Sequence, residues 1–527
     1  MDATHLFELG VAMFVAIIAL HFAARKLGLP PSVALLAGGG ALAFVPGAPA
    51  IAVNPDLVLV IFLPPLLLDG AWTIPVARLR RHMVGIASLA VGSVFFTCAV
   101  VAVVAHMLVP SLPWAACAAL GAVVAPPDAI AARAALARVK LPGRLRVLLE
   151  GESLLNDASG LVLFRFAVAA AATGTFSAVE AGGGFVALSL GGAVVGALVG
   201  LSWTKLVRRL GDEYLIIAAT ALMSWVAYLA GEMAHVSGVI AVVTAGLIAS
   251  WNQHTVWSAS TRIRGTAFWT VLVFLLEAAV FVLIGLSLRD VVDRGGGFGV
   301  VAATMGWPIL AVLAALVAAR FVWVFGWEVV VRGAKAAGWR GARPMSWGAA
   351  SVISWAGARG VVTLALALST PAGFPGRDLI LVTAFAVIVG TVLGQGTTLG
   401  RVVGWARLRE PEAEKPAMSM SEAEAAMAEM QVRTVEALAY DKAGALIHPQ
   451  LLERYQRRAK ASIDYAAETE AHRPRLEAHF DVVLAAVAAG RAELVRLHRA
   501  GEIDDETLDE LERDLDLEEL GAISATA

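Results

Sequence analysis

Two aspartates lie in apolar segments that would otherwise suit the interior of a membrane. Asp157 belongs to GESLLNDASG, residues 151–160, inside a longer apolar run, and Asp128 belongs to VVAPPDAIAA. Two carboxylates in a poorly solvated site cannot both be ionised cheaply, so such a pair holds either a proton or a cation. Competition between a proton and a cation for one site is the chemistry that an exchanger needs.

Residue spacing places the polar side chains of GESLLND on two neighbouring faces of a helix. Ser153 and Asp157 are four residues apart and share one face, and Glu152 and Asn156 share the next. Asp157 lies near the middle of its apolar run, so we expect its carboxylate to converge with that of Asp128. Alternatively, Asp128 caps a half-helix that begins after Pro127.

Other ionisable residues also fall inside apolar segments. Each costs ~2.5–3.5 kcal/mol near a bilayer centre on insertion scales, so each should face protein or water. A buried cation needs a partner, and we therefore expect Glu152 and Arg359 to form an ion pair that holds two halves of the protein together. The remaining residues of this group are Asp69, Arg165, Glu277 and Arg320.

Two of the apolar segments contain residues that interrupt a helix. Pro126 and Pro127 precede Asp128, and two glycines, Gly357 and Gly360, flank Arg359. Proline removes a backbone donor and blocks regular helix. An interrupted segment in each half of a transporter points to an ion site near the midplane, where freed carbonyls can coordinate a small cation.

Composition places these segments in a membrane protein with many spans. The chain of 527 residues is 58% hydrophobic and 16% charged, with a mean hydropathy of +0.74, whereas about a quarter of the residues in a soluble domain are charged. We expect the lipid bilayer as a partner and no nucleic acid. No Gly-rich phosphate loop is present, so we expect no cofactor and an ion gradient as the source of energy.

Hydropathy predicts thirteen transmembrane helices with the N-terminus outside and the C-terminus in the cytoplasm. A span needs about 20 apolar residues, and alternate connections carry eighteen of the 21 lysines and arginines between spans, as the positive-inside rule requires. The opposite directions of spans five and twelve suggest inverted repeats of six helices. The predicted spans are 6–24, 31–48, 56–74, 83–108, 112–135, 146–172, 183–204, 214–231, 236–250, 267–288, 299–328, 346–369 and 379–403.

The composition changes after residue 405, which predicts a transmembrane domain at 1–405 and a cytosolic region at 406–527. The second region is charged and rich in alanine, and its pattern is helical. Ser421 followed by Glu424 predicts a capping box at the start of a helix.

Four motifs resemble the monovalent cation/proton antiporters of the sodium–proton exchanger type, in their electroneutral branch. They are FLPPLLLDGAW at 62–72, VVAPPDAIAARA at 123–134, GESLLNDASGLVLF at 151–164 and WAGARGVVTLALAL at 355–368. The resemblance implies a thirteen-helix inverted-repeat fold with two broken, crossing helices, and a homodimer in the cell (inner) membrane. It also implies exchange of Na⁺, or of K⁺ or Li⁺, for H⁺, with a role in pH homeostasis.

The resemblance also implies roles for individual residues. Asp157 would carry cation and proton in turn, with Ser153, Asp128, the carbonyl of Pro127 and Asp69 near the ion, and Asn156 would order the helix crossing. It supports the pair of Glu152 with Arg359. The chain departs from many relatives by lacking the threonine of a Thr-Asp-Pro motif, because it has Pro127-Asp128-Ala129, and by carrying Asp69 in place of Glu.

Two other functions compete with exchange. Two membrane aspartates could serve an intramembrane aspartyl protease, but the Gly-x-Gly-Asp motif expected there is missing. Broken helices would also suit a cation channel, but no repeated filter loop is present.

Overall fold

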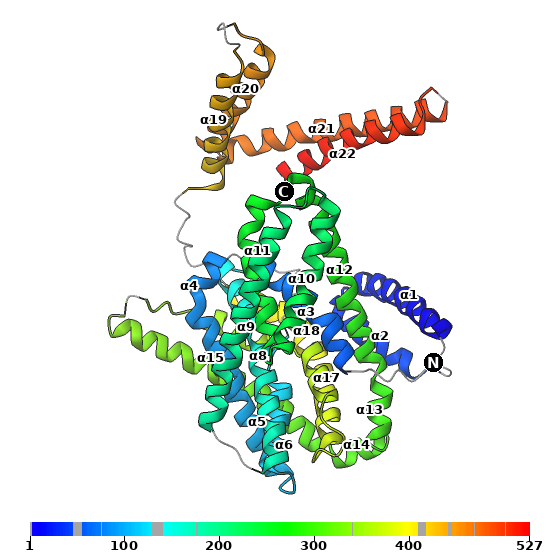
Figure 1. Ribbon diagram of the computed structural model, residues 1–527, viewed down its shortest axis with the longest axis vertical. Helices are drawn as coiled ribbons and strands as arrows, with labels where there is room; N and C mark the ends of the chain where they lie inside the picture. Colours follow the sequence, from blue (N-terminus) through cyan, green and yellow to red (C-terminus); the bar gives the residue numbers. More distant parts are fainter. Residues whose placement is uncertain are drawn as a thin grey trace. The chain divides into compact units, whose positions relative to one another are not determined.

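In the computed structural model, all regular elements of the described residues are helices, apart from one isolated bridge between Tyr440 and Leu446 (Figure 1). The structure describes residues 3–45, 55–74, 76–128, 141–174, 178–339, 341–408, 418–440, 445–467, 469–500 and 502–526. These residues form two compact units, Met1–Arg409 and Glu410–Ala527. The expected second half of span five, including Ala129, lies outside the described residues.

The first unit contains long apolar helices interrupted at a few points. Its first elements are α1 (Ala3–Leu27), α2 (Pro31–Ala43), α3 (Pro55–Thr73), α4 (Val76–Ala87), a π-helical turn (Ser88–Ser93), α5 (Val94–Leu108) and α6 (Trp114–Val124). Next come α8 (Gly143–Thr173), α9 (Ala178–Val207), α10 (Glu213–Met233), α11 (Gly238–Val256), α12 (Ala259–Leu286), α13 (Leu288–Arg294) and α14 (Phe298–Thr304). The unit ends with α15 (Gly306–Ala336), α16 (Trp347–Trp355), α17 (Val361–Leu368) and α18 (Arg377–Ala406).

Eight helical stretches among the described residues are long and apolar enough to cross a membrane. Three shorter apolar helices accompany them, at Pro31–Ala43, Leu59–Thr73 and Trp114–Val124. The prediction of an all-helical membrane protein is confirmed. Several predicted boundaries were wrong, because helices continue past the apolar residues: the fourth span starts at Val76 instead of residue 83, and its arginines lie on α4.

Helix ends in the first unit follow ordinary capping rules. Asp212, Ser237, Ser258 and Ser346 accept hydrogen bonds from backbone N–H groups in the first turns of α10, α11, α12 and α16. Helix α8, which carries GESLLND, ends at Gly174 in the left-handed conformation, with φ of 71°. At two places, residues 125–128 after α6 and residues 356–360 between α16 and α17, the chain leaves the helix among mostly buried residues.

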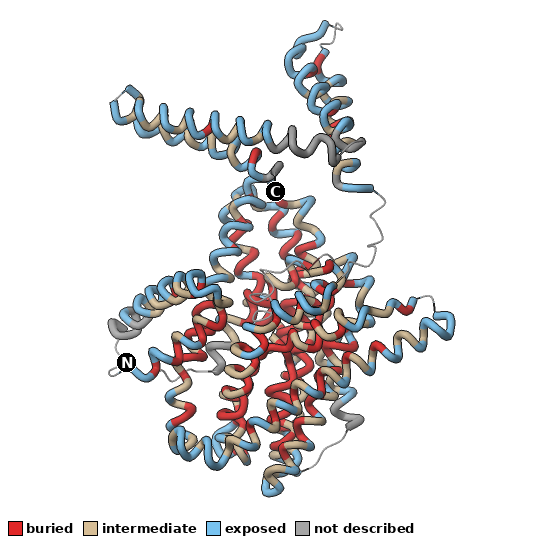
Figure 2. The backbone as a smooth tube through the Cα atoms, turned by 180° about the vertical axis from the view of Figure 1, so that it is seen from behind, coloured by how far each residue is buried: buried red, intermediate tan, exposed pale blue. Residues whose placement is uncertain are grey.

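Buried residues concentrate where the broken helices meet their neighbours, as Figure 2 shows by the red segments in the middle of this unit. One apolar cluster joins α5, α6, α15 and α18, and another joins α2, α12, α17 and α18. A third joins α3, α4, α8, α11 and α16. Helices α8 and α17 each contribute residues to two of these clusters. This apolar packing holds the polar groups of both helices in position.

The second unit consists of two helical pairs. Helix α19 (Met420–Leu438) packs against α20 (Pro449–Ala467), and α21 (Thr469–Arg499) packs against α22 (Asp505–Thr526). The capping box at the start of α19 uses Ser419 and Glu422, two residues before the predicted pair. The prediction failed because S-x-x-E occurs twice in SMSEAE and the helix starts at the first occurrence.

Candidate ion-binding site

Two non-helical segments meet near the ends of α6, α16 and α17. The first, residues 125–128, follows α6, and the second, residues 356–360, joins α16 to α17. The backbone N–H of Asp128 donates to the carbonyl of Ala358 at 2.7 Å. Helix ends inside a membrane leave backbone groups without intrahelical partners, so side chains must satisfy the remaining donors and acceptors at this crossing.

Arg359 satisfies the carbonyl end of α6. Its guanidinium donates from Nε to the carbonyl of Val124 at 2.7 Å and from Nη2 to that of Ala125 at 3.0 Å. It also donates to the carbonyl of Gly357, and its backbone N–H donates to the hydroxyl of Thr391 at 3.0 Å. A cation at a helix C-terminus is favoured by the helix dipole, by up to ~2 kcal/mol when partly buried.

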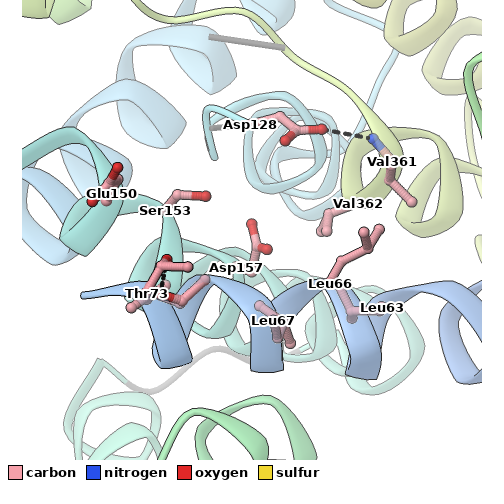
Figure 3. Close-up of a pocket in the computed structure, with 12 residues that line it drawn as sticks. Leu63, Leu66, Leu67, Thr73, Asp128, Glu150, Ser153, Asp157, Val361 and Val362 are labelled. Atoms are coloured by element: carbon pink, nitrogen blue, oxygen red, sulfur yellow. Dashed lines mark hydrogen bonds between the residues drawn. The ribbon is translucent and has the colours of Figure 1, made fainter. Parts of the chain in front are cut away.

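Asp128 makes the complementary contact at the amino end of α17. Its Oδ2 accepts a hydrogen bond from the backbone N–H of Val361 at 3.1 Å, drawn as the dashed line in Figure 3. The predicted cap on the half-helix after Pro127 falls outside the described residues, and the cap observed is on the other broken helix. A Cβ at Gly360 would overlap this carboxylate, so only glycine leaves Asp128 room to reach the helix end.

Asn156 joins α8 to the crossing. Its Nδ2 donates to the carbonyl of Pro127 at 2.5 Å, and its side chain is fully buried. The carbonyl expected beside the ion is thus engaged by Asn156, and Pro127 does not line the pocket described below.

The expected ion pair between Glu152 and Arg359 was wrong. Glu152 instead pairs with Arg320 of α15 through two parallel hydrogen bonds of 2.6 and 2.8 Å, and both side chains are at most 3% exposed. Arg320 also donates to the carbonyls of Ile353 and Ala356, at 3.1 and 3.4 Å, at the end of α16. Arg359 is occupied by carbonyls of α6, which explains why Glu152 takes the other arginine.

A pocket lies beside the crossing and collects polar side chains from α3, the crossing segment and α8. Asp157, Asp128 and Ser153 line it together with Glu150 and Thr73, and leucines and valines complete the wall. Figure 3 shows the Asp157 carboxylate pointing into the space between α3 and the crossing. The cavity measures about 40 Å³, and since about 10–15 Å³ admits one water, it has room for a small cation with some of its waters.

Asp157 differs from Glu152 and Asp128 in having no hydrogen-bond or ion-pair partner among the described residues. It is 8% exposed, and no residue of the described ranges donates a hydrogen bond to it or pairs with it. Glu152 is neutralised by Arg320, and Asp128 accepts from the start of α17. An isolated buried carboxylate is so costly that it takes up a proton or a counter-cation.

The other charged residues that the sequence singled out do not line this pocket. Asp69 projects from α3 into a separate pocket with Trp72, Trp257 and Trp269, and Thr73 lines both pockets. Arg165 pairs with Glu232 of α10 at 2.9 Å. Glu277 is half-buried on α12.

Three residues at or near the pocket were missed or misassigned from the sequence. Glu150 precedes Ser153 and Asp157 on the same helix face by three and seven residues, a spacing that could have revealed it. Arg320 was recognised as a midspan charge without its partner. Thr391 carried no signal, because its contact with Arg359 spans 32 residues and depends on tertiary packing.

The fold and the site together define a helical membrane protein with a carboxylate pocket beside the contact between the segment after α6 and the segment that joins α16 to α17. The chain belongs to the sodium/hydrogen exchanger family: the family described as "Sodium/hydrogen exchanger, transmembrane" matches residues 10–405. The resemblance inferred from four motifs is thereby confirmed. The relatives are transporters, not enzymes.

Individual relatives agree with this assignment. A protein of Bacillus pumilus named "Sodium, potassium, lithium and rubidium/H(+) antiporter" is 34% identical over 67% of this chain, and the match spans 54% of that protein's length. An uncharacterized Na⁺/H⁺ exchanger of Mycobacterium bovis is 32% identical over 97% of this chain and 96% of its own length. The sodium proton antiporter MjNhaP1 of Methanocaldococcus jannaschii, solved at pH 8, has a similar fold, with a TM-score of 0.59 at 21% identity, covering 77% of this chain and 99% of that one.

The buried pair of Glu152 and Arg320 generates a stability prediction. Glu152→Ala leaves Arg320 buried without its carboxylate, and we expect it to lower the free energy of unfolding by about 3–5 kcal/mol. Thermal unfolding of the purified protein in detergent measures the loss. The matched control is Glu232→Ala, which breaks the more exposed pair with Arg165 and should cost about 1 kcal/mol or less. Equal melting of the two variants would contradict the assigned pair.

The close approach at Gly360 generates a second prediction. Gly360→Ala forces the Asp128 carboxylate away from Val361, and we expect about 1–3 kcal/mol of destabilisation, the usual range for overpacking. Gly404→Ala is the control, since a Cβ there has no neighbour within 4 Å in the described structure. The same detergent unfolding assay should leave Gly404→Ala unchanged, and an equally unchanged Gly360→Ala would refute the contact.

Proposed function

We propose that this protein is a secondary active antiporter that exchanges a monovalent cation for a proton across the membrane. Na⁺ is the cation we favour, with K⁺ and Li⁺ as the other candidates, since a Bacillus relative carries all three in its name. The observation that carries the proposal is Asp157, a nearly buried carboxylate in a small pocket without a partner among the described residues. In this proposal the ion and the proton are the cargo, and no resident cofactor takes part.

The proposed mechanism is competition at Asp157. A cation entering the pocket meets the Asp157 carboxylate, with the hydroxyl of Ser153 and the carboxylate of Asp128 on the adjoining wall. Oxygen ligands of this kind suit a small hard cation. A proton on Asp157 removes the charge that attracts the cation, so the two cargoes exclude each other. Asp69, in the neighbouring pocket, contributes negative potential from beyond Thr73.

The proposal includes an electroneutral stoichiometry. Asp128 is held at the start of α17 and Glu152 by Arg320, which supports Asp157 as the single acid that changes partners in each cycle. One cation is then exchanged for one proton. Because no net charge crosses, a membrane potential, worth ~2.3 kcal/mol per charge per 100 mV, neither drives nor opposes transport.

We also propose the finer topology that the sequence predicts. Thirteen spans are related as two inverted repeats of six helices, with α6 in one repeat corresponding to the α16–α17 pair in the other. The protein lies in the cell (inner) membrane with its N-terminus outside, and residues 406–527 are cytoplasmic. It functions as a homodimer in pH homeostasis.

The test is cation-dependent proton exchange by purified protein in proteoliposomes. Adding Na⁺ to vesicles with an imposed pH gradient should dissipate it with saturation, and an imposed potential should not change the rate. We expect Asp157→Asn to abolish exchange while the protein remains folded and inserted, because the amide has no negative charge for the cation and does not take up a proton. Asp212→Asn, at a helix cap away from the pocket, controls for the loss of one acid.

The outcomes separate the competing functions. Saturable exchange retained by Asp157→Asn would remove the assignment of Asp157. A flux that follows the membrane potential without saturation would indicate a channel. The absence of any flux for each of Li⁺, Na⁺ and K⁺ would refute the antiporter.

Glu150 provides a further test of how the cation reaches Asp157. It lines the same pocket, seven residues before Asp157 on α8, so its charge adds to the local attraction for cations. An attraction of about 1 kcal/mol corresponds to roughly a fivefold change. We expect Glu150→Gln to raise the cation concentration for half-maximal exchange several-fold at an unchanged maximal rate. A lowered maximal rate at unchanged half-saturation would contradict a role in recruitment.

A further inference from the structure

A second polar pocket lies between α4, α8 and α15, and it shares no lining residue with the ion pocket. We call it the basic pocket and define it by Arg81, His82, Arg144 and Arg343. Its cavity measures about 160 Å³. The proposed antiport mechanism makes no use of it.

The basic residues reach this pocket from three separate parts of the chain. Arg81 and His82 lie on the second turn of α4, Arg144 on the first turn of α8, and Arg343 in the connection between α15 and α16. The Arg144 guanidinium donates to the carbonyls of Pro344, at 3.3 Å, and of Arg343. These acceptors are neutral, so they orient the cation and leave its positive charge available to an anion.

One acid lines the basic pocket among the described residues, and other groups already bind it. The Glu328 carboxylate lies 3.1 Å from Nε of Arg332 and accepts from the backbone N–H of Met345 at 2.8 Å. Arg332 itself lies over the ring of Trp347, 4.4 Å from its centroid. Glu328 therefore holds the connection in place, and three arginines line the same pocket.

The other side of the basic pocket is apolar and uncovered. Val84, Val330 and Trp339 line it and are about 60% exposed. In a membrane protein, valines exposed on the sides of long apolar helices contact acyl chains, and tryptophan favours the boundary between lipid and water. The pocket thus joins a positively charged end to a surface that suits hydrocarbon.

We propose that the basic pocket binds the phosphate headgroup of an anionic phospholipid. The arginines contact the phosphate, for which bidentate guanidinium hydrogen bonds are well suited, and the acyl chains lie along Val84 and Val330. Basic pockets between transmembrane helices recognise such headgroups by charge. A bound lipid joins α4, α8 and the connection before α16, and so stabilises the folded protein.

The experiment measures thermal unfolding of the full-length protein in a neutral detergent. Phosphatidylglycerol should raise the unfolding temperature by several degrees, because a ligand that binds only the folded state stabilises it by mass action. Phosphatidylcholine at the same concentration should have a much smaller effect. Inorganic phosphate and glycerol phosphate, which lack acyl chains, should not reproduce the rise, and if either does, the site binds a free anion and the lipid proposal fails.

Variants locate the effect in the pocket. Arg81→Gln combined with Arg343→Gln should abolish most of the rise caused by phosphatidylglycerol. The control is Arg80→Gln combined with Arg146→Gln, which removes the same charge from α4 and α8 outside the pocket and should retain the rise. If the first double variant does not fold, Arg343→Gln alone, in an exposed connection, makes the same test. A full rise in the pocket variant, or an equal rise with phosphatidylcholine, would overturn the proposal.

Discussion

Backbone groups freed inside a membrane must find partners, and this requirement governs the centre of the molecule. Where α6 stops and α17 starts, the chain supplies a cation for the carbonyl end and an anion for the amide end: Arg359 on Val124 and Ala125, and Asp128 on Val361. Each charge comes from the opposite broken helix, so neither segment can be satisfied without the other. The crossing is therefore a reciprocal arrangement, and α8 is fastened to it through Asn156.

This division of roles supports the proposal that a single acid carries the cargo. Arg359 and Arg320 each bind the carbonyl end of a broken helix, while Glu152 neutralises Arg320 and Asp128 binds the start of α17. Asp157 is then the buried carboxylate that no described residue neutralises. A scaffold whose charges are satisfied internally can keep its geometry while the charge state of one group changes.

The sequence predicted the elements of this centre better than their pairing. Midspan charges, prolines and glycines located both breaks and the convergence of Asp128 with Asp157, because those signals are local. The predicted partner of Glu152, Arg359, was wrong. Arg359 and Arg320 both lie in apolar segments, and their depth in the membrane alone does not distinguish them. Which guanidinium reaches Glu152 depends on the rotation of α15 and on the carbonyls of α6, which are tertiary properties. Asp69 was likewise placed on the correct helix, but it faces a different pocket.

The double attachment of Arg320 restricts how the protein can move. Its guanidinium binds Glu152, five residues before Asp157 on α8, and also the carbonyls that end α16. Any displacement of α8 relative to α15 and α16 would break a buried salt bridge, at about 3–5 kcal/mol. In the proposed exchange, Asp157 would therefore change its exposure to the two sides together with α15 and α16, because Arg320 ties these helices to α8.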